Sequence, residues 1–428
     1  MKSNNKWILP ALQYRNYRLF FSGQGVSLIG TWIQRIAMSW LVYRLTDSVF
    51  LLGLVGFTGQ IPLFLLAPFT GVLADRMNRH QVLVVTQTLA MIQALILTFL
   101  VLAGTIEIWQ IISLSIFLGF VDALDMPVRQ SFMGEIVQKK DLGNAIALNS
   151  SIVNSAQLLG PSIAGLLIVS VGEGICFLLN GISYLFVILS LLAMNMESKR
   201  KEKPRTRVLK GVKEGFSYAF GFMPIRSILL LLGLVSLVGM PYRVFMPVFA
   251  RDILHGGPHV FGFLIGSSGL GALVGSIYLA SRKSVLGLEK WVALAACIFG
   301  AGLIGFSLSR IFWLSLFLIL WASFGMMVQM ASSNTILQTI VDEDKRGRVM
   351  SFYAMAFRGM APFGSLLAGG LASRIGVPTT LIISGVFCIL GSVIFAQKLP
   401  LLWEMVRPIY VRMGIVSEEV PRVPKAEK

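Results

Sequence analysis

Twelve long apolar segments limit most strongly what this chain can fold into. Each offers about the twenty residues that an α-helix needs to cross the hydrocarbon core of a bilayer. Mean hydropathy is +0.77, and only 13% of the residues are charged, so a membrane protein is expected. The expected spans are 20–41, 51–74, 80–103, 108–130, 145–170, 174–195, 224–250, 260–281, 289–308, 310–335, 351–373 and 378–398.

The fold class follows from the lipid environment. Backbone polar groups inside a bilayer must be satisfied internally, which leaves only helices and closed barrels. The segments are longer than barrel strands and lack their alternation of apolar and polar residues. The chain is therefore predicted to be an all-α polytopic membrane protein with twelve transmembrane helices.

The basic residues predict its orientation. The net charge of +17 is concentrated in alternate connections between spans, as the positive-inside rule describes, and not in a nucleic-acid-binding surface. A plasma-membrane protein with both termini in the cytoplasm is expected. The connections then assigned to the cytoplasm contain Arg76 and Arg79, Lys139 and Lys140, eight basic residues from Lys199 to Lys213, Arg282 and Lys283, and Lys345, Arg346 and Arg348.

One basic stretch, "NMESKRKEKPRTRVLKGVKEGF", separates six spans from six. A solvated linker is favoured over a patch that binds lipid headgroups. "IVQKKDLGNAIAL" and "IVDEDKRGRVMSF" also align at an offset of 204 residues, as a parallel duplication would leave them. Two pseudo-symmetric halves with a cavity between them are expected. The predicted parts are an N-terminal half at 1–195, a cytoplasmic linker at 196–223, a C-terminal half at 224–400 and a cytoplasmic tail at 401–428.

The loop "GVLADRMNRH", residues 71–80, resembles the signature of the major facilitator superfamily between its second and third helices. "ALDMPVRQSFMGEIV", "LGNAIALNSSIVNSAQLLGPSIAGLLI" and "CFLLNGISYL" resemble the branch that includes the enterobactin exporter and macrolide efflux proteins. The resemblance implies a secondary transporter of the bacterial inner membrane that works as a monomer. It implies proton-coupled export, by alternating access, of a drug, macrolide or siderophore.

The same resemblance implies a cytoplasmic gate. Asp75 would face the start of the eleventh helix, and Arg76 and Arg79 would tie the loop to its neighbours. Asn78 replaces the usual glycine and is expected to adopt the left-handed backbone conformation that Asn tolerates. His80 replaces the usual basic residue, which leaves that contact open.

Gly160, Pro161 and Gly165 resemble the antiporter signature of the fifth helix. Small residues allow helices to approach closely, and proline bends a helix. The motif favours export over import. Ordinary helix packing is the alternative interpretation.

Two carboxylates, Asp122 and Asp125, lie on one face of the fourth helix. Such groups are costly in a membrane and usually face a water-filled cavity or a partner. Burial favours the neutral carboxyl group, so both residues are candidates for proton coupling, with Asp122 preferred. A structural pair with Arg129 and a misplaced helix boundary are the alternatives. Ser115 stands where many proton-driven exporters carry an arginine.

Polar residues of the first span are expected to line the cavity. By helix rise, Arg35 lies about 22 Å from the cytoplasmic edge, Asp122 about 9 Å and Arg358 about 10 Å. Direct pairing of Arg35 with Asp122 is therefore not expected, and Arg35 better suits an anionic substrate, an outer carboxylate or the outer lipid headgroups. Arg358 is assigned to the gate, where it would attract Asp122 only in the outward-facing state, or else serve its own half. The cavity candidates are Gln24, Thr31, Gln34 and Arg35.

Other chemistries find little support. The chain has no Walker loop, zinc-protease motif or nucleophile elbow, so neither an enzyme nor an ATP-driven pump is expected. No cofactor, metal site or nucleic-acid partner is predicted; the expected partners are a small-molecule substrate, protons and membrane lipid. A lipid flippase or membrane enzyme on the same scaffold is the alternative function, and a transport-inactive sensor is a third. Packing is the role expected for Cys176, Cys297 and Cys388.

Overall fold

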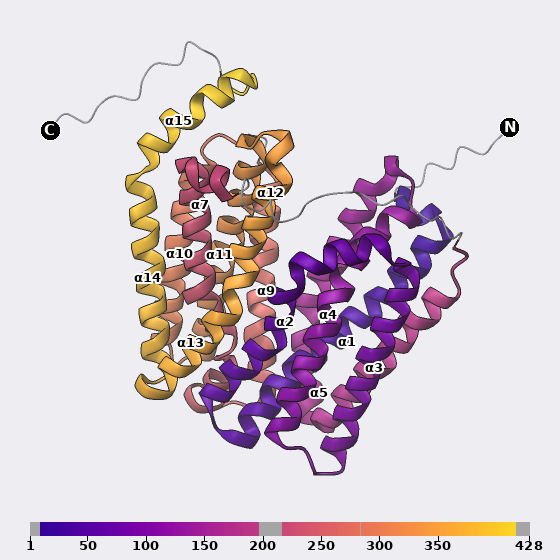
Figure 1. The fold of residues 1–428 in the computed structure, drawn as a ribbon. Coiled ribbons are helices and arrows are strands. Elements are labelled where there is room, and N and C mark those ends of the chain that lie inside the picture. The colour runs from indigo at the N-terminus through magenta and orange to yellow at the C-terminus, as the bar shows by residue number, and fades with distance from the viewer. Residues whose placement is uncertain (1–8, 197–215, 283, 417–428) are drawn as a thin grey trace.

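A computed structural model describes residues 9–196, 216–282 and 284–416, but not the side chains at 67–69, 71–76 and 344. The described chain is helical and contains no β-strand. Figure 1 shows two bundles, α1–α5 and α7–α15, which approach each other at one end and diverge toward the other. We call these the closed end and the open end. The beginning of α1 and helices α12 and α15 lie at the open end.

The first bundle contains four long helices and a helical hairpin. A short 3₁₀ turn, Pro10–Gln13, precedes α1, and a second, Lys139–Asp141, precedes α5. The helices are α1 (Arg15–Thr46), α2 (Val49–Arg76), α3 (Arg79–Leu102), α4 (Ile108–Ile136) and α5 (Leu142–Leu192).

The second bundle contains more irregular turns. Its first crossing begins with α7 (Met223–Leu234) and continues through a π turn (Val235–Gly239), a 3₁₀ turn (Met240–Arg243), α8 (Met246–Val248) and a π turn (Phe249–Ile253). The next three helices are α9 (Pro258–Ala280), α10 (Leu288–Leu308) and α11 (Phe312–Ile340). The last group is α12 (Glu343–Ala354), a π turn (Met355–Gly359), α13 (Met360–Ile375), α14 (Val377–Gln397) and α15 (Leu399–Arg412).

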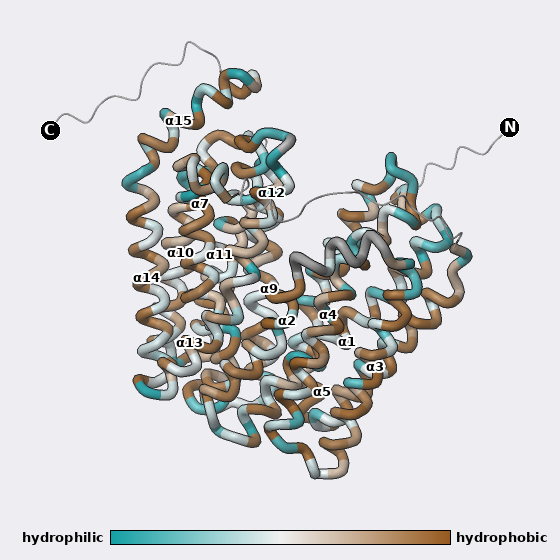
Figure 2. Tube along the Cα trace, in the orientation of Figure 1, coloured by the Kyte–Doolittle hydropathy of each residue, from teal (hydrophilic) through white to brown (hydrophobic). Residues whose placement is uncertain are grey.

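Nine segments of the described chain are long and apolar enough to cross a membrane. One of them, Lys139–Leu192, is long enough for two crossings and contains a kink at Gly172, where φ is 80° and ψ is 170°. Helix α1 and the helical stretch Glu343–Ile375 are outside the nine. The expected all-helical membrane fold is therefore present, and twelve crossings result if these two helices are added and the kinked segment is counted twice. Figure 2 shows hydrophobic residues along the helices and hydrophilic ones mainly near their ends.

Helix ends follow local sequence signals. The Asn78 side chain accepts a hydrogen bond from the Gln81 amide and caps α3, with φ at −71°. The expected left-handed conformation at Asn78 is thus wrong, because this residue serves as an N-cap, a position that Asn favours with an extended backbone. Glu107 and Gln110 form a capping box at the start of α4.

The internal repeat is visible in the two halves. Ile136 is the last residue of α4, and Ile340, its partner at an offset of 204, is the last residue of α11. The residues that follow, Val137 and Val341, both have extended backbones, with φ at −130° and −90°. The aligned segments therefore end equivalent helices in the same way.

Several helices extend further at the open end than the apolar segments predicted. Helix α4 ends at Ile136 and α11 at Ile340, each at least five residues beyond the expected boundary. The stretch that contains Arg358 begins at Glu343. Hydropathy marks where the apolar residues end, whereas these helices continue into polar sequence. This difference changes the depth of the charged residues within the helices.

Candidate functional site

Three charged side chains lie near the middle of their helices. Asp122 is midway along α4, about 21 Å from each end by helix rise. Arg358 lies about 22 Å from the start of the helical stretch Glu343–Ile375. Arg35 lies about 16 Å from the closed end of α1. The sequence-based depths of Asp122 and Arg358 were too shallow because their helices begin or end further out at the open end.

Arg35 is exposed although its neighbours Gln34 and Ile36 are buried. Its guanidinium lies over the ring of Trp32, 5.4 Å from the centroid. It interacts electrostatically with Asp122 of the same bundle and with Arg358 of the other. Arg35 therefore faces the space between the bundles. It makes no hydrogen bond or ion pair with the described residues.

Arg358 reaches from the second bundle toward the first. It is exposed, and its Nη1 donates to Sδ of Met126 on α4 at 3.2 Å. Arg358 lies in the π turn Met355–Gly359, and such turns occur often at functional sites. The Ser236 hydroxyl, from the π turn Val235–Gly239, donates to the Phe357 carbonyl. Asp122 and Arg358, both described, form no ion pair in this conformation.

The two carboxylates of α4 differ in their surroundings. Asp125 is 4% exposed and accepts hydrogen bonds from Thr86 and Gln87 of α3, each at 2.8 Å. It also pairs with Arg129 one turn along its own helix. Asp122 is partly exposed and accepts no hydrogen bond from the described residues. Arg129 thus neutralises Asp125, and Asp122 is the carboxylate without a direct partner.

Gln34 belongs to a buried polar chain inside the first bundle. Its amide donates to Gln93 of α3 at 2.9 Å, and its carbonyl accepts from Asn180 of α5 at 2.7 Å. Gln24 is also buried. Thr31 donates to the Ser27 carbonyl at 2.9 Å. Of the four cavity candidates, Arg35 is the one that lies exposed between the bundles.

The closed end is joined by polar contacts that the sequence did not predict. The Tyr43 hydroxyl donates to the Asp252 carboxylate of the other bundle. Beside it, Arg251 pairs with Asp47 at 2.5 Å and lies over the Tyr43 ring. In the sequence Asp47, Arg251 and Asp252 are isolated charges in short connections, and no motif pairs them with each other or with Tyr43.

Aromatic side chains seal the bundles from the closed end to mid-depth. Trp40 stacks on Phe261, with ring centroids 6.3 Å apart. Phe363 of α13 contacts Phe57 and Phe64 of α2, at 5.9 Å and 5.3 Å between centroids. Together with the polar pairs, these contacts close one end of the molecule.

Glycines of the signature on α5 allow close helix contacts. A Cβ on Gly165 would lie 2.6 Å from the Pro258 carbonyl oxygen of the other bundle, and one on Gly262 would lie 2.5 Å from the Pro161 carbonyl oxygen. A Cβ on Gly160 would lie 2.6 Å from Cβ of Trp32. Gly165 and Pro161 therefore lie between the bundles, and Gly160 lies within the first.

The loop between α2 and α3 is only partly described. Arg79 pairs with Glu135 of α4 at 2.6 Å, and Nε2 of His80 lies 2.8 Å from the Leu191 carbonyl oxygen. The Asp75 and Arg76 side chains lie outside the described residues, so their predicted roles stay predictions. Arg358 lies at mid-depth and not beside Arg79 at the open end.

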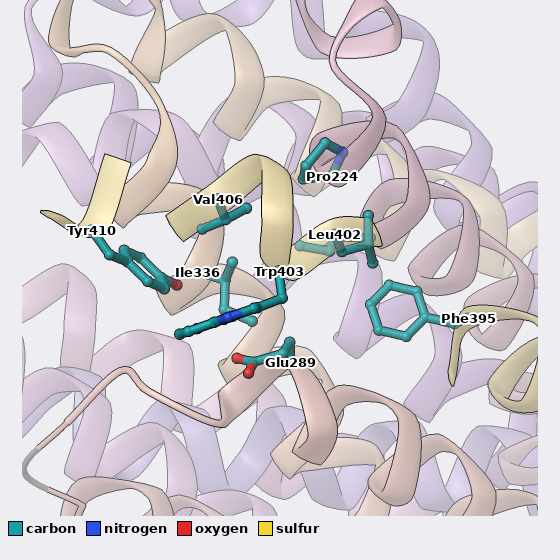
Figure 3. A pocket seen from close by; sticks show the side chains of 9 residues that line it. Pro224, Glu289, Ile336, Phe395, Leu402, Trp403, Val406 and Tyr410 are labelled. Atoms are coloured by element: carbon teal, nitrogen blue, oxygen red, sulfur yellow. The ribbon is translucent and has the colours of Figure 1, made fainter. Parts of the chain in front are cut away.

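A separate cavity lies under α15, away from these residues. Figure 3 shows Trp403 and Tyr410 of α15 beside Glu289 of α10. The cavity volume is about 20 Å³, room for about one water molecule. Desolvation, followed by the nearby Glu289 charge, raises the pKa of Tyr410 to about 12. The predicted tail thus begins with a docked helix, and its cavity is too small for a transported molecule.

Comparison with known proteins agrees with this architecture. Residues 9–406 match the family described as transmembrane secretion effector. The chain is 26% identical to the staphyloferrin A transporter of Staphylococcus aureus, over 88% of this chain and 95% of the relative. It is 24% identical to macrolide efflux protein A of Streptococcus pyogenes, over 88% and 95%.

A solved structure shares the fold. A bacterial homologue of the human lysosomal transporter Spinster, crystallised in an inward-facing and unoccupied conformation, matches with a TM-score of 0.68 and 14% identity, covering 92% of this chain and 98% of the other. The chain belongs to the transmembrane secretion effector family of the major facilitator superfamily. It is a multi-pass membrane transporter, and the proteins it resembles are transporters and not enzymes.

Proposed function

We propose that this protein is a secondary active exporter that exchanges a small molecule for protons by alternating access. One observation carries the proposal. Of two carboxylates on one helix face, Asp125 is hydrogen bonded through both oxygens, whereas Asp122 is unpaired among the described residues and lies at mid-depth within electrostatic range of the exposed Arg35. A carboxylate that is not held by a partner is free to gain and lose a proton as its surroundings change.

The closed and open ends of the molecule would face opposite sides of the membrane. Basic residues cluster in the connections at the open end, so the positive-inside rule assigns that end, with both termini, to the cytoplasm. The conformation described here is then inward-facing. The halves at 1–195 and 224–400, joined by the linker at 196–223, would rock about the site as a functional monomer in the bacterial inner membrane, surrounded by lipid.

The relatives supply the substrate classes to test. One is named for staphyloferrin A and one for macrolides, so a siderophore or macrolide is the first choice. The proposed gate consists of Asp75, Arg76 and Arg79 at the open end, with Arg358 deeper in the site.

The test is transport in proteoliposomes with an imposed pH gradient. A radiolabelled macrolide and staphyloferrin A are the substrates, and an internal pH-sensitive dye reports proton movement. We expect Asp122→Asn to lose gradient-driven accumulation while keeping substrate exchange without a gradient. Glu343→Gln, which changes an exposed carboxylate at the open end, should transport like the wild type. Full gradient-driven accumulation by Asp122→Asn would overturn the proposal.

A further inference from the structure

Arg35 and Arg358, from opposite bundles, lie near mid-depth within electrostatic range of each other, and neither pairs with an anionic group among the described residues. Of the described residues, Trp32 places its ring beside the Arg35 guanidinium, and Arg358 donates to the thioether of Met126, which is a weak acceptor. Both side chains are exposed, and each acts electrostatically on the other. The site therefore holds two positive charges whose donors make one hydrogen bond to the part of the chain that the structure describes.

This arrangement is unfavourable without a ligand. A charged side chain in the middle of a membrane protein is costly, and such residues usually pair or mark a substrate pathway. Here like charges repel, and Asp122 is within electrostatic range of Arg35 but forms no ion pair with it. The three groups together carry one excess positive charge, which an anion would neutralise.

We propose that Arg35 and Arg358 bind a negatively charged group of the transported molecule, a carboxylate or a similar oxyanion, and thereby join the two bundles through the substrate. The guanidinium fork suits this role because it presents paired donors to a planar oxyanion. The inference rests on the proposed transport function and deepens it by defining the substrate as anionic, which favours a siderophore over the macrolides with their basic amino sugars.

The surroundings of the two arginines add a second requirement. Trp32 lies beside Arg35, Met126 touches Arg358, and Phe64 packs on Gly359, the residue after Arg358. Aromatic rings and a flexible thioether offer an adaptable apolar surface. The ligand is therefore an amphipathic anion, with its charged group on the arginines and its apolar part against these side chains.

The negative charge of Asp122 should weaken anion binding in the conformation described here. Its negative charge attracts Arg35 and repels a negative ligand, so neutralising it should strengthen anion binding. In an exchange cycle the two ligands are taken up from opposite sides, so the anion enters the inward-facing site and the proton reaches Asp122 after the site has opened outward. Anion affinity and proton coupling thus respond in opposite directions to one substitution.

The experiment uses the full-length protein in detergent and a fluorescent probe, dansyl-glutamate, with its dimethyl ester as the uncharged match. We expect the acid to bind and the ester to bind at least tenfold more weakly. Arg35→Gln and Arg358→Gln should each weaken acid binding roughly 10- to 100-fold, the loss expected for a charged hydrogen bond, and leave ester binding unchanged. Arg310→Gln, which removes a positive charge at the closed end, should bind like the wild type.

Further variants distinguish a failure of the proposed anion site from a failure of the proposed proton-coupled transport. Thermal unfolding midpoints identify variants that fail to fold, and Arg35→Lys and Arg358→Lys keep the charge, so they should retain part of the affinity. Asp122→Asn should bind the acid more tightly than the wild type while losing gradient-driven transport. Equal binding of acid and ester, or unchanged acid binding in the Arg35→Gln/Arg358→Gln double variant, would overturn the anion site. Tight acid binding without proton-driven transport would leave the site standing and reject the coupling mechanism.

Discussion

The Tyr43 hydroxyl donates a hydrogen bond to the Asp252 carboxylate and so joins α1 to the π turn Phe249–Ile253 of the other bundle. Tyr43 is 4% exposed, so this contact is shielded from water on the tyrosine side. The adjacent Asp47 and Arg251 side chains are 67% and 41% exposed. Two contacts between the same helices thus differ in solvation.

Asp252→Asn should open the closed end more than Asp47→Asn does. Asp252→Asn replaces a charged acceptor by a weaker neutral one in a partly shielded hydrogen bond, at a cost of about 1 to 1.5 kcal/mol, whereas an exposed ion pair contributes about 0 to 1 kcal/mol. Spin labels at Thr105 and Arg310, in closed-end connections of the two bundles, should report a larger population of long distances in Asp252→Asn. Equal distance distributions in the two variants would contradict this ranking.

Asp125→Asn should destabilise the fold rather than alter coupling. It leaves Arg129 without its ion-pair partner in a buried cluster, and breaking such a pair costs about 3 to 5 kcal/mol. Thermal unfolding in detergent should show a clear loss of stability, with a smaller loss in Thr86→Val, which removes one donor at about 1 kcal/mol. An Asp125→Asn protein as stable as the wild type, with transport abolished, would instead place Asp125 in the coupling mechanism.

Gly165→Ala should weaken the closed end because its methyl group would lie 2.6 Å from the Pro258 carbonyl oxygen. Gly134→Ala is the matched control, since a Cβ there meets nothing within 4 Å. The control should be neutral or gain up to about 1 kcal/mol from helix propensity. The same spin-label pair should show separation in Gly165→Ala alone, and an unchanged distance would show that α9 can adjust.

Ser236→Ala should reduce affinity for the anionic probe. It removes the hydrogen bond that holds the Phe357 carbonyl beside Arg358, a contact worth about 0.5 to 1.5 kcal/mol. Acid binding should weaken several-fold, while ester binding stays constant because the apolar surface is intact. Ser351→Ala, which loses a bond within its own helix, serves as the control. A parallel loss of acid and ester binding would indicate general destabilisation of the second bundle.

The helical membrane fold was predictable because hydropathy is a local property of the chain. The repeat that aligns Ile136 with Ile340 was also visible in the sequence, and the structure ends both helices at these residues. The depth of the charged residues within their helices was less predictable. Asp122 was expected about 9 Å from one edge, yet it lies midway along α4, because the helix continues to Ile136 beyond its apolar segment.

Side-chain partners were not accessible to sequence reasoning. Gln34 and Arg35 are adjacent polar residues of one span, yet one is bonded inside a bundle and the other is exposed between bundles. Adjacent residues of an α-helix point in directions about 100° apart. The positions of the neighbouring helices determine which of these directions faces the inside of the bundle and which faces the space between the bundles. Tyr43 and Asp252 are 209 residues apart, with no pattern to connect them.

The polar chain through Gln34, Gln93 and Asn180 has a kinetic consequence. It ties α1, α3 and α5 together with hydrogen bonds that need not break when the bundles move apart. The surfaces that would separate combine glycine backbone and aromatic rings with the two polar contacts of the closed end, Tyr43–Asp252 and Asp47–Arg251. In the proposed cycle the two polar contacts would open into water, which can satisfy their donors, so we expect a low activation barrier to switching with each bundle moving as a rigid body.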